Sequence, residues 1–184
     1  MRSHPYLEQL VAARRFAFVY GPFGTGKTRL AVHVAKLALG IGLNPLFVET
    51  EAVGTAVSRL YEGAFKIATS FDEMVHTIAL AALSKRYLVV DSINSFYLSE
   101  PPSIRKRALT FVAATLKRTG GFAVGQVREK EGVLTSPGLN LVSSYADVIA
   151  RTEKIDRDRF KLEVLKPERK LMLFRVSRGD VEWL

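Results

Sequence analysis

Residues 21–28 have the residue types and the spacing of a phosphate-binding loop. They read Gly-Pro-Phe-Gly-Thr-Gly-Lys-Thr and fit the pattern G-x-x-x-x-G-K-[ST] in full. Glycines let successive backbone N–H groups curve around phosphates, and the start of a following helix adds its positive dipole end. Lys27 can reach the β- and γ-phosphates, and the Thr28 hydroxyl can bind Mg²⁺. The alternative is a chance match within a glycine-containing turn, so the flanking residues decide between the two.

The flanking residues predict the strand and the helix that such a loop needs. Residues 16–20 form an apolar run, which indicates a buried strand ending at Gly21. Residues 27–39 carry apolar side chains at helical spacing, and the glycines at 40 and 42 predict the end of that helix. A strand, a loop and a helix in this order form the context in which the motif binds phosphates. The sequence therefore predicts a nucleotide site.

Carboxylates at the ends of two further strands could complete the chemistry. Asp91 closes the apolar run 87–91, where a carboxylate can lie on the Mg²⁺ side of a nucleotide. Alone, an Asp at this place is more often a turn former or a helix N-cap. Glu49 and Glu51 lie at the end of the strand expected over 45–50, where a carboxylate can orient or deprotonate water. Both could also be solvated loop residues, and the residues alone leave this open.

The chain as a whole alternates apolar runs with amphipathic stretches, which is typical of a parallel sheet flanked by helices. From about residue 146 the helices stop, and three strands in succession predict antiparallel strands at the sheet edge. We expect one domain over 1–184 with an α/β fold, whose mostly parallel twisted sheet carries antiparallel C-terminal edge strands. Other expected strands cover 65–69, 122–127, 146–151, 159–165 and 171–176, and expected helices cover 3–14, 70–83, 103–118 and a stretch up to Leu60.

Composition excludes several other kinds of site. The chain has 184 residues and no cysteine, so disulfides, Cys-ligated zinc, iron–sulfur clusters and thiol catalysis are excluded. The three histidines are scattered and show no metal-binding spacing. There is no long apolar run and no secretion signal, so we expect a soluble intracellular protein with no membrane partner.

Positive charge is concentrated in one part of the chain. Lys and Arg number 27 against 18 Asp and Glu, a formal net charge of +9. Within residues 101–130 only Glu129 opposes a group of basic residues, namely Arg105, Lys106, Arg107, Lys117, Arg118, Arg128 and Lys130. Such a cluster predicts salt-sensitive and sequence-tolerant binding of a polyanion. The alternative is that these residues form the solvated face of the helix over 103–118.

From residue 16 to about residue 182 the chain resembles the ATPase core of the RecA/RadA recombinase superfamily, and most of all archaeal RadA paralogues of the RadB kind. The matching stretches are the phosphate loop, Phe47–Glu51 followed by Ser58–Leu60, Leu88–Ser95 with its Walker B Asp, Val124–Val127, and the turn Lys166–Glu168. Members of this family have an α/β fold of the P-loop NTPase class. The resemblance therefore implies a RecA-like fold with ATP and Mg²⁺ as cofactors.

The resemblance also implies a role for each matching residue. Glu51, rather than Glu49, takes the position of the catalytic glutamate, and Gln126 that of the glutamine that senses the γ-phosphate; Lys27 completes the catalytic set. Mg²⁺ is expected on Thr28 and Asp91. ATP is expected on Gly21, Phe23, Gly24, Thr25, Gly26, Lys27, Thr28 and Arg29.

Two loops that face DNA are implied at 97–107 and 128–143. The DNA-binding residues would then be Arg105, Lys106, Arg107, Arg128 and Lys130. Phe96 and Tyr97 could stack on bases or belong to the core.

One departure from the family concerns the N-terminus. Full recombinases carry an N-terminal helix-hairpin-helix domain and a linker with a Phe-x-x-Ala polymerisation motif. Here only about 15 residues, expected as a short helix, precede the first strand, and Phe65–Ala68 spells the motif inside the core. We therefore expect a paralogue that assists a recombinase partner or forms a homo-oligomer, in the cytoplasm with the nucleoid.

The expected function is a DNA-dependent or weakly active ATPase that binds DNA, preferably single-stranded, in homologous recombination or repair. Hydrolysis is expected to be slow, because the chain shows no obvious arginine finger. The alternative is a KaiC-like regulatory ATPase or adaptor that switches a protein partner without binding DNA, since it shares the fold and the phosphate loop. A small-molecule kinase would need a lid and an acceptor pocket, which the sequence does not identify.

Overall fold

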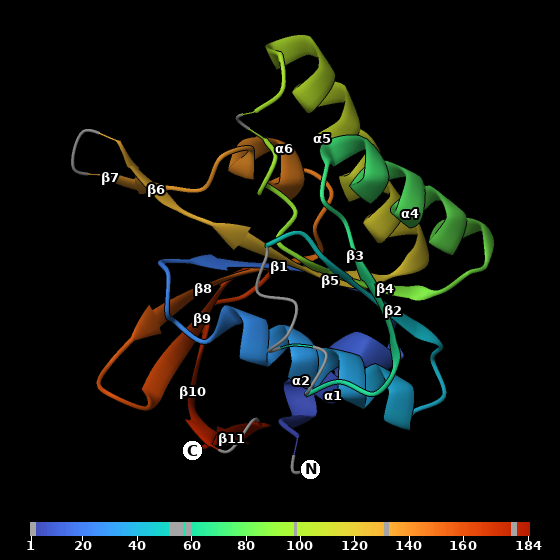
Figure 1. Cartoon of the computed structure of the whole chain (residues 1–184). Helices are drawn as coiled ribbons and strands as arrows, with labels where there is room; N and C mark the ends of the chain where they lie inside the picture. The colour runs from blue at the N-terminus through green and yellow to red at the C-terminus, as the bar shows by residue number, and fades with distance from the viewer. Residues whose placement is uncertain (1–2, 52–56, 58–59, 98, 131–132, 178–179) are drawn as a thin grey trace.

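The chain folds as an α/β structure around one large sheet, shown by a computed structural model (Figure 1). The described residues are 3–51, 57, 60–97, 99–130, 133–177 and 180–184, without the side chains of 129, 130, 133 and 134. The strands are β1 (Phe16–Gly21), β2 (Pro45–Glu49), β3 (Ala64–Ile67), β4 (Tyr87–Asp91), β5 (Gly121–Gln126), β8 (Val148–Lys154), β9 (Arg159–Lys166), β10 (Lys170–Ser177) and β11 (Asp180–Trp183). Across the described part of the sheet their order is β11-β10-β9-β8-β1-β5-β4-β2-β3.

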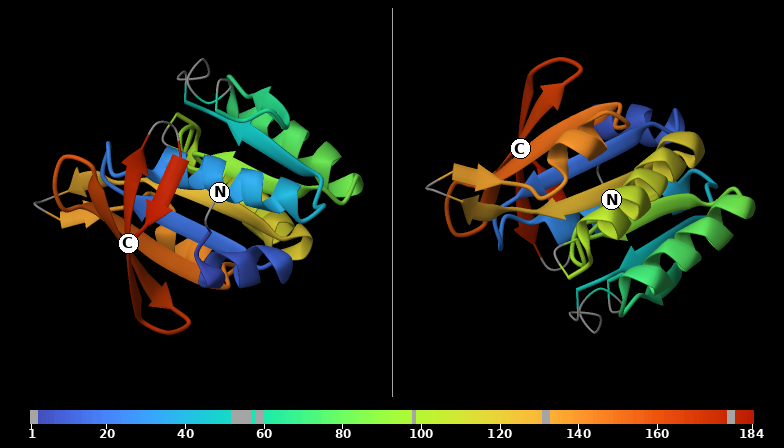
Figure 2. Two further views of the ribbon diagram at one scale, coloured as in Figure 1. Left: turned by 90° about the horizontal axis from the view of Figure 1, so that it is seen from below. Right: turned by 90° about the horizontal axis from the view of Figure 1, so that it is seen from above.

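Helices cover both faces of the sheet. One face carries α1 (Pro5–Ala12) and α2 (Lys27–Gly40), and the opposite face carries α4 (Phe71–Leu83), α5 (Pro102–Thr119) and α6 (Leu139–Ser143) (Figure 1, Figure 2). A short hairpin of β6 (Arg128–Lys130) and β7 (Val133–Thr135) projects from the body beyond β5. Within the described ranges, none of the helices has the length and apolar character needed to cross a membrane.

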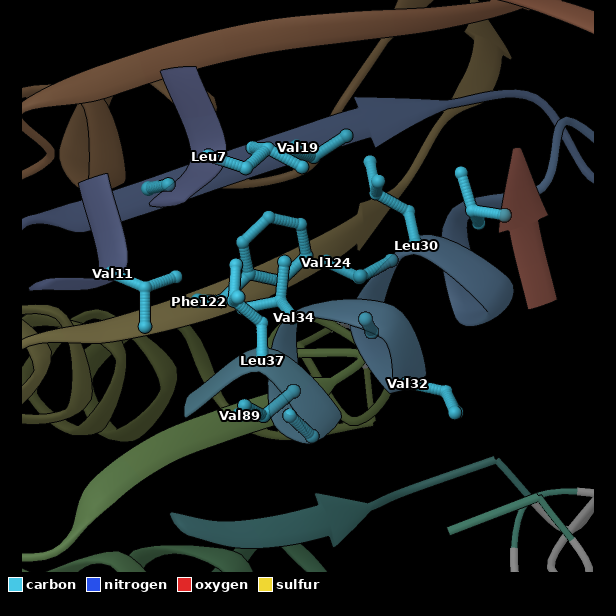
Figure 3. Packing of buried hydrophobic residues seen from close by; sticks show 14 of the residues in the cluster. Leu7, Val11, Val19, Leu30, Val32, Val34, Leu37, Val89, Phe122 and Val124 are labelled. Atoms are coloured by element: carbon cyan, nitrogen blue, oxygen red, sulfur yellow. The ribbon is translucent and has the colours of Figure 1, made fainter. Parts of the chain in front are cut away.

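Two hydrophobic clusters fill the space between the sheet and its helices. On the α2 side, Leu30, Val34 and Leu37 point at side chains of the sheet such as Phe122 and Val124 (Figure 3). Leu7, Leu10 and Val11 extend this cluster from α1. The second cluster joins α4 and α5 to the other face, with residues such as Phe71, Met74, Ile78, Leu109 and Val112. The central strands are therefore buried on both faces, which is why they read as continuous apolar runs.

β1 occupies the middle of the sheet and pairs in parallel on both sides. Its register with β5 runs from Phe16↔Gly121 to Gly21↔Gln126, and it also pairs in parallel with β8. β8 in turn pairs antiparallel with β9, so the change of direction lies between these two strands. Of the three C-terminal strands expected from the sequence, β9 and β10 are confirmed as antiparallel, while β8 pairs in parallel with β1 and antiparallel with β9.

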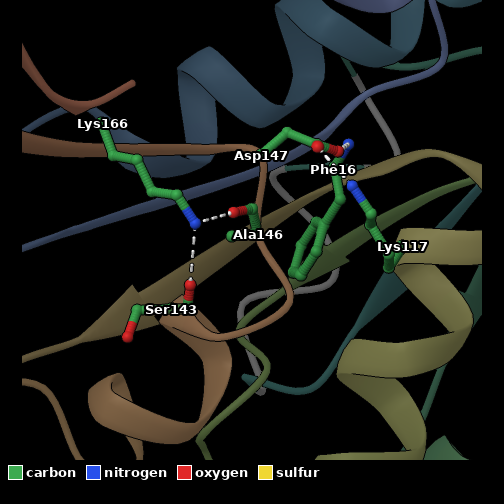
Figure 4. A network of polar contacts seen from close by, with 6 residues as sticks. All are labelled: Phe16, Lys117, Ser143, Ala146, Asp147 and Lys166. Carbon is green, nitrogen blue, oxygen red and sulfur yellow. Dashed lines mark hydrogen bonds and ion pairs between the residues drawn. The ribbon is translucent and has the colours of Figure 1, made fainter. Parts of the chain in front are cut away.

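Polar contacts hold the start of β8 beside the start of β1. The Asp147 carboxylate accepts a hydrogen bond from the Phe16 N–H at 3.0 Å and is also bonded to the Lys117 ammonium (Figure 4). Lys166 donates to the carbonyls of Ala146, at 2.7 Å, and Ser143, at 3.1 Å. These bonds satisfy backbone groups where the chain leaves α6, and they fix the register of β8 against β1.

Three expectations from the sequence differ from the structure. Residues 102–107 begin α5, because Pro102 fits the first turn of a helix, and so they do not belong to a loop. Residues 128–143, expected as a loop that faces DNA, contain the β6–β7 hairpin and α6. β11 was not expected from the sequence. The helical stretch expected up to Leu60 lies mostly outside the described residues, including Ser58 and Arg59.

Replacing Gly21 should destabilise the fold. A Cβ atom there would lie 2.3 Å from the Thr152 Oγ1 atom and 2.5 Å from the Thr152 carbonyl, so β1 and β8 would have to separate. We expect Gly21→Ala to lower the free energy of unfolding by roughly 1–3 kcal/mol in denaturant titrations. Gly40→Ala is the control, because that Cβ meets nothing within 4 Å and alanine favours the helix. Equal stabilities of the two variants would contradict this prediction.

Candidate functional site

The phosphate loop connects the end of β1 to the start of α2 and exposes the first turn of that helix. Gly26 is the N-cap residue with φ 81°, and Gly24 has φ 72°; both values favour glycine. No side chain caps α2. The N–H groups of its first turn are therefore available to an anion, as at other phosphate-binding helix ends.

The C-terminal strands support the loop from behind. The Thr25 hydroxyl donates to the Pro22 carbonyl at 2.8 Å and lies 2.8 Å from the Thr152 hydroxyl on β8. A Cβ at Gly26 would lie 3.0 Å from the ring of Phe174 on β10. Phe23, at the tip of the loop, is 91% exposed. The loop backbone is thus held by strands that follow it by more than a hundred residues, while its tip faces outward.

Lys27 and Asp91 are two buried ionisable residues near the phosphate loop, and each influences the pKa of the other. Burial lowers the pKa of Lys27, and the carboxylates of Asp91 and Glu51 oppose this effect. Burial raises the pKa of Asp91 to about 6, although the hydrogen bond from Thr28 acts in the opposite direction. The Lys27 ammonium donates to the Pro22 carbonyl at 2.6 Å. Both side chains are therefore held with little water around them, in a region where a phosphate and a cation would find strong partners.

Thr28 and Asp91 offer oxygen ligands of the kind that Mg²⁺ prefers. Across the described ranges, no group of three or more His, Cys, Asp or Glu could hold a metal ion by itself. A magnesium ion at this place would therefore also need oxygens from a bound phosphate. The donor set fits a metal that arrives with a nucleotide.

Glu51 and Gln126 lie side by side at the same edge. The Gln126 Nε2 atom donates to both carboxylate oxygens of Glu51, at 2.8 and 3.0 Å. Gln126 is the last residue of β5 and Glu51 follows β2, with β4 between these two strands. Glu49 is 2% exposed in β2 opposite Asp91, so its interpretation as a solvated loop residue is wrong. The residues expected to be catalytic are therefore brought to one edge, with Glu51 close enough to influence the pKa of Asp91 and of Lys27.

Sequence reasoning missed a polar network that continues the strand pairing beyond β2 and β4. The Thr50 N–H donates to the Asp91 carbonyl at 2.8 Å, and the Thr50 hydroxyl accepts from the Ser92 N–H at 2.8 Å. Ser95 and Asn94 extend this network toward β5. The signal was the run Ser-Ile-Asn-Ser after Asp91, because small polar residues directly after a buried strand tend to bond to backbone.

The basic residues separate into two groups along α5. Arg105, Lys106 and Arg107 lie in its first two turns, and the Arg105 guanidinium lies 5.2 Å from the centre of the Tyr97 ring. Lys117 and Arg118 lie at the other end of the helix, about 27 Å long at 1.5 Å per residue. The cluster counted along the sequence is therefore not one patch in space.

The start of α5 also borders a hollow beside the β6–β7 hairpin. The hollow has a volume of about 390 Å³ and is lined by Tyr97, Lys106, Thr135, Ser136, Gly138, Leu139, Asn140 and Leu141. Arg128, in β6, is exposed. The side chain of Lys130 lies outside the described residues. Phe96 and Tyr97 pack partly buried against the cluster under α4 and α5.

Comparison with known proteins gives distant relatives of one kind. The chain is 28% identical over 165 residues to Protein RecA of Rubrobacter xylanophilus, which covers 73% of this chain and 47% of that protein. It is 24% identical over 204 residues to Protein RecA of Staphylococcus aureus, which covers 91% of this chain and 58% of that protein. No protein-family model matches the chain. The similarity supports a relationship with the RecA-like recombinase superfamily, and the chain spans about half the length of these curated relatives.

The buried carboxyl of Asp91 predicts an unusual dependence of stability on pH. Because its pKa is raised to about 6 in the fold, its contribution to stability is present below about pH 4 and is lost as the pH rises through 6. In EDTA at pH 8, we expect Asp91→Asn to raise the free energy of unfolding by roughly 1–3 kcal/mol relative to the unaltered chain. At pH 4 the difference should shrink, because the carboxyl is then protonated.

Denaturant titration at both pH values measures this effect. Asp158→Asn is the control, because Asp158 is exposed and its replacement removes no buried charge. A lower stability of Asp91→Asn at pH 8 would show that burial of the Asp91 charge does not oppose folding.

Proposed function

We propose that this protein is an ATP-binding, slowly hydrolysing recombinase paralogue that binds single-stranded DNA and assists recombination or repair at the nucleoid. The observation that carries the proposal is the meeting of four groups at one sheet edge. The phosphate loop, the Thr28–Asp91 hydrogen bond, Glu51 and Gln126 all lie at the carboxyl ends of β1, β4, β2 and β5. The distant similarity to RecA proteins supports the same function.

ATP would be held mainly by backbone and by Lys27. The N–H groups at the start of α2 face the phosphates, and the Lys27 ammonium moves from the Pro22 carbonyl to the β- and γ-phosphate oxygens. Mg²⁺, carried on Thr28 and Asp91, would neutralise the charge that develops on these oxygens. Arg29 and the exposed Phe23 flank the loop and complete the binding residues.

Glu51 would act as the base for the attacking water. In hydrolysis the water oxygen bonds to the γ-phosphorus, the bond to the bridging oxygen of ADP breaks, and the water proton passes to the Glu51 carboxylate. In the structure Gln126 Nε2 donates a hydrogen bond to each oxygen of that carboxylate. A γ-phosphate that attracts Gln126 would release Glu51 toward water, so Gln126 would report the nucleotide. Turnover remains slow because no arginine finger is apparent in the sequence.

DNA binding would use the start of α5 and the adjoining hollow. Lys106 and Arg107 are exposed there, Arg105 lies over Tyr97, and Arg128 and Lys130 belong to the neighbouring hairpin. The hollow combines an aromatic ring, a cation and the Asn140 amide, which together suit an unpaired nucleotide. Further copies of the chain or a recombinase partner would assemble on the DNA with it. A KaiC-like adaptor role would use the ATP site alone.

Glu51→Gln should separate binding from hydrolysis. The amide keeps the size of the side chain and its contact with Gln126 but cannot take a proton from water. We expect unchanged ATP affinity in a fluorescent-nucleotide titration and at least a hundredfold slower phosphate release, in line with the usual contribution of a general base. Glu168→Gln, an exposed residue in another turn, serves as the control. Normal hydrolysis by Glu51→Gln would remove Glu51 from the catalytic role.

Two pairs of basic residues test the DNA site. Lys106→Ala with Arg107→Ala removes two exposed charges at the start of α5, and Lys85→Ala with Arg118→Ala removes two exposed charges elsewhere. We expect the first pair to weaken binding of an oligothymidylate and to flatten the slope of log affinity against log salt by about 1.4. The second pair should leave both unchanged. Weak binding by the unaltered chain at low salt, with ATP-dependent capture of a purified protein partner, would favour the adaptor function instead.

A further inference from the structure

Asn94 is a buried amide at the point where β4, β5 and the β6–β7 hairpin meet. Its side chain is 6% exposed, and its Oδ1 atom accepts from the Gln126 N–H at 2.9 Å. Its Nδ2 atom donates to the Gln126 carbonyl at 3.0 Å. The pairing of β4 with β5 ends at Asp91, and the Asn94 amide then bonds to Gln126 as a neighbouring strand would. The N–H and the carbonyl of Gln126 therefore both bond to the Asn94 side chain.

The same amide also reaches the far end of the hairpin. Its Nδ2 atom lies 3.2 Å from the Ser136 hydroxyl and 3.2 Å from the Pro137 carbonyl. Gln126 precedes β6, and Ser136 directly follows β7. Ser136 also rests on β5, because a Cβ at Gly125 would lie 3.1 Å from its hydroxyl. Asn94 therefore joins the chain entering the hairpin to the chain leaving it.

The Asn94 amide has more acceptors than hydrogens. An asparagine NH₂ group carries two N–H donors, and three oxygens lie within 3.2 Å of it. At least one of the two hydrogens is therefore shared between two oxygens. A shift of the Gln126 carbonyl away from Asn94 would leave both hydrogens for Ser136 and Pro137. A small movement of Gln126 thus changes how firmly the hairpin base is held.

Gln126 also contacts Glu51, because its side chain donates hydrogen bonds to the Glu51 carboxylate. A phosphate that attracts its Nε2 atom pulls on the same residue whose backbone Asn94 holds. The two ends of this connection are the Glu51 carboxylate, in the ATP site, and Ser136, in the wall of the hollow beside α5. Hydrogen bonds on both sides of Gln126, one set to its side chain and one to its backbone, therefore link the two proposed sites.

We propose that Asn94 is a positioning residue that couples occupancy of the ATP site to the hairpin and so to the affinity for DNA. This inference rests on the proposed function and goes beyond it, because it assigns a role to Asn94, a residue that the proposed function does not use. If Asn94 served only to satisfy buried polar groups, its removal would lower stability and leave any coupling unchanged. Coupling between two ligands is reciprocal and is measured as a ratio of affinities.

The experiment measures the affinity for a fluorescein-labelled oligothymidylate with and without Mg²⁺ and a nonhydrolysable ATP analogue. In the unaltered chain we expect the analogue to change this affinity about fivefold or more, the usual lower end of such coupling. Asn94→Asp keeps the volume and an acceptor oxygen but removes both donor hydrogens, and Asn94→Ala removes the amide. In both variants we expect the ratio to fall to about one, with the affinity for the analogue alone retained.

Ser95→Ala is the matched control. Ser95 lies in the same segment and bonds to Thr50 and Ser92, and within the described residues its hydrogen bonds reach neither Gln126 nor Ser136. It should lose stability while keeping the ratio of the unaltered chain. Ser136→Ala removes the hairpin's hydroxyl partner of Asn94 and should give an intermediate ratio of affinities. If Asn94→Ala does not fold, Ser136→Ala and Asn94→Asp together test the proposal.

Each outcome has a defined meaning. An unchanged ratio in the Asn94 variants overturns the positioning role, and so does a ratio of one in an unaltered chain that binds both ligands. In these two cases the proposed function stands. An unaltered chain that binds neither the analogue nor the oligothymidylate overturns the proposed function, and the inference with it.

Discussion

The parallel pairing of β1 with β5 is the contact on which the rest of the structure depends. It places Gly21 opposite Gln126, and the next two pairings place Asp91 opposite Val124 and Glu49. Because all three pairings are parallel, the four strands end in one row, and whatever follows each strand meets there. A slip of one residue in any of them would turn the side chains to the opposite face of the sheet. The two hydrophobic clusters, one on each face, fix the register and therefore the site.

This row has an energetic cost, because it removes charged groups from water. Lys27 is 5% exposed and Asp91 is 4% exposed, and burial shifts both pKa values toward the neutral forms. Opposite charges nearby and the Thr28 hydrogen bond offset only part of that effect. A phosphate would bring a further negative charge to Lys27, and a cation would bring a positive charge to Asp91. The same arrangement that costs stability therefore favours the binding of a phosphate and a cation.

The sequence predicted the parts of the site that depend on local residues. The phosphate loop and the strands before it and before Asp91 were evident from spacing and apolar runs, and the resemblance pointed to Glu51 and Gln126. The direction of β8 could not be predicted, since an apolar run reads alike in either orientation. The Asn94 network could not be predicted either, because its partners Ser136 and Pro137 are more than forty residues away. The basic cluster counted along the sequence is not one patch for a related reason. The length of α5 separates Arg105–Arg107 from Lys117 and Arg118, although these residues are close in sequence.

The central place of β1 in the sheet also determines when the sheet can form during synthesis. β1 leaves the ribosome well before its partners β5 and β8, which begin about 100 to 130 residues later in the chain. Thr152 and Phe174, which lie against the phosphate loop, are synthesised later still. Until then the apolar residues of β1 have no neighbouring strand, and a nascent chain of this length exposes them to other molecules. Synthesis must pass Phe174 before the phosphate loop has all of these supports, so a chain terminated before that residue would carry the motif without the strands that hold it.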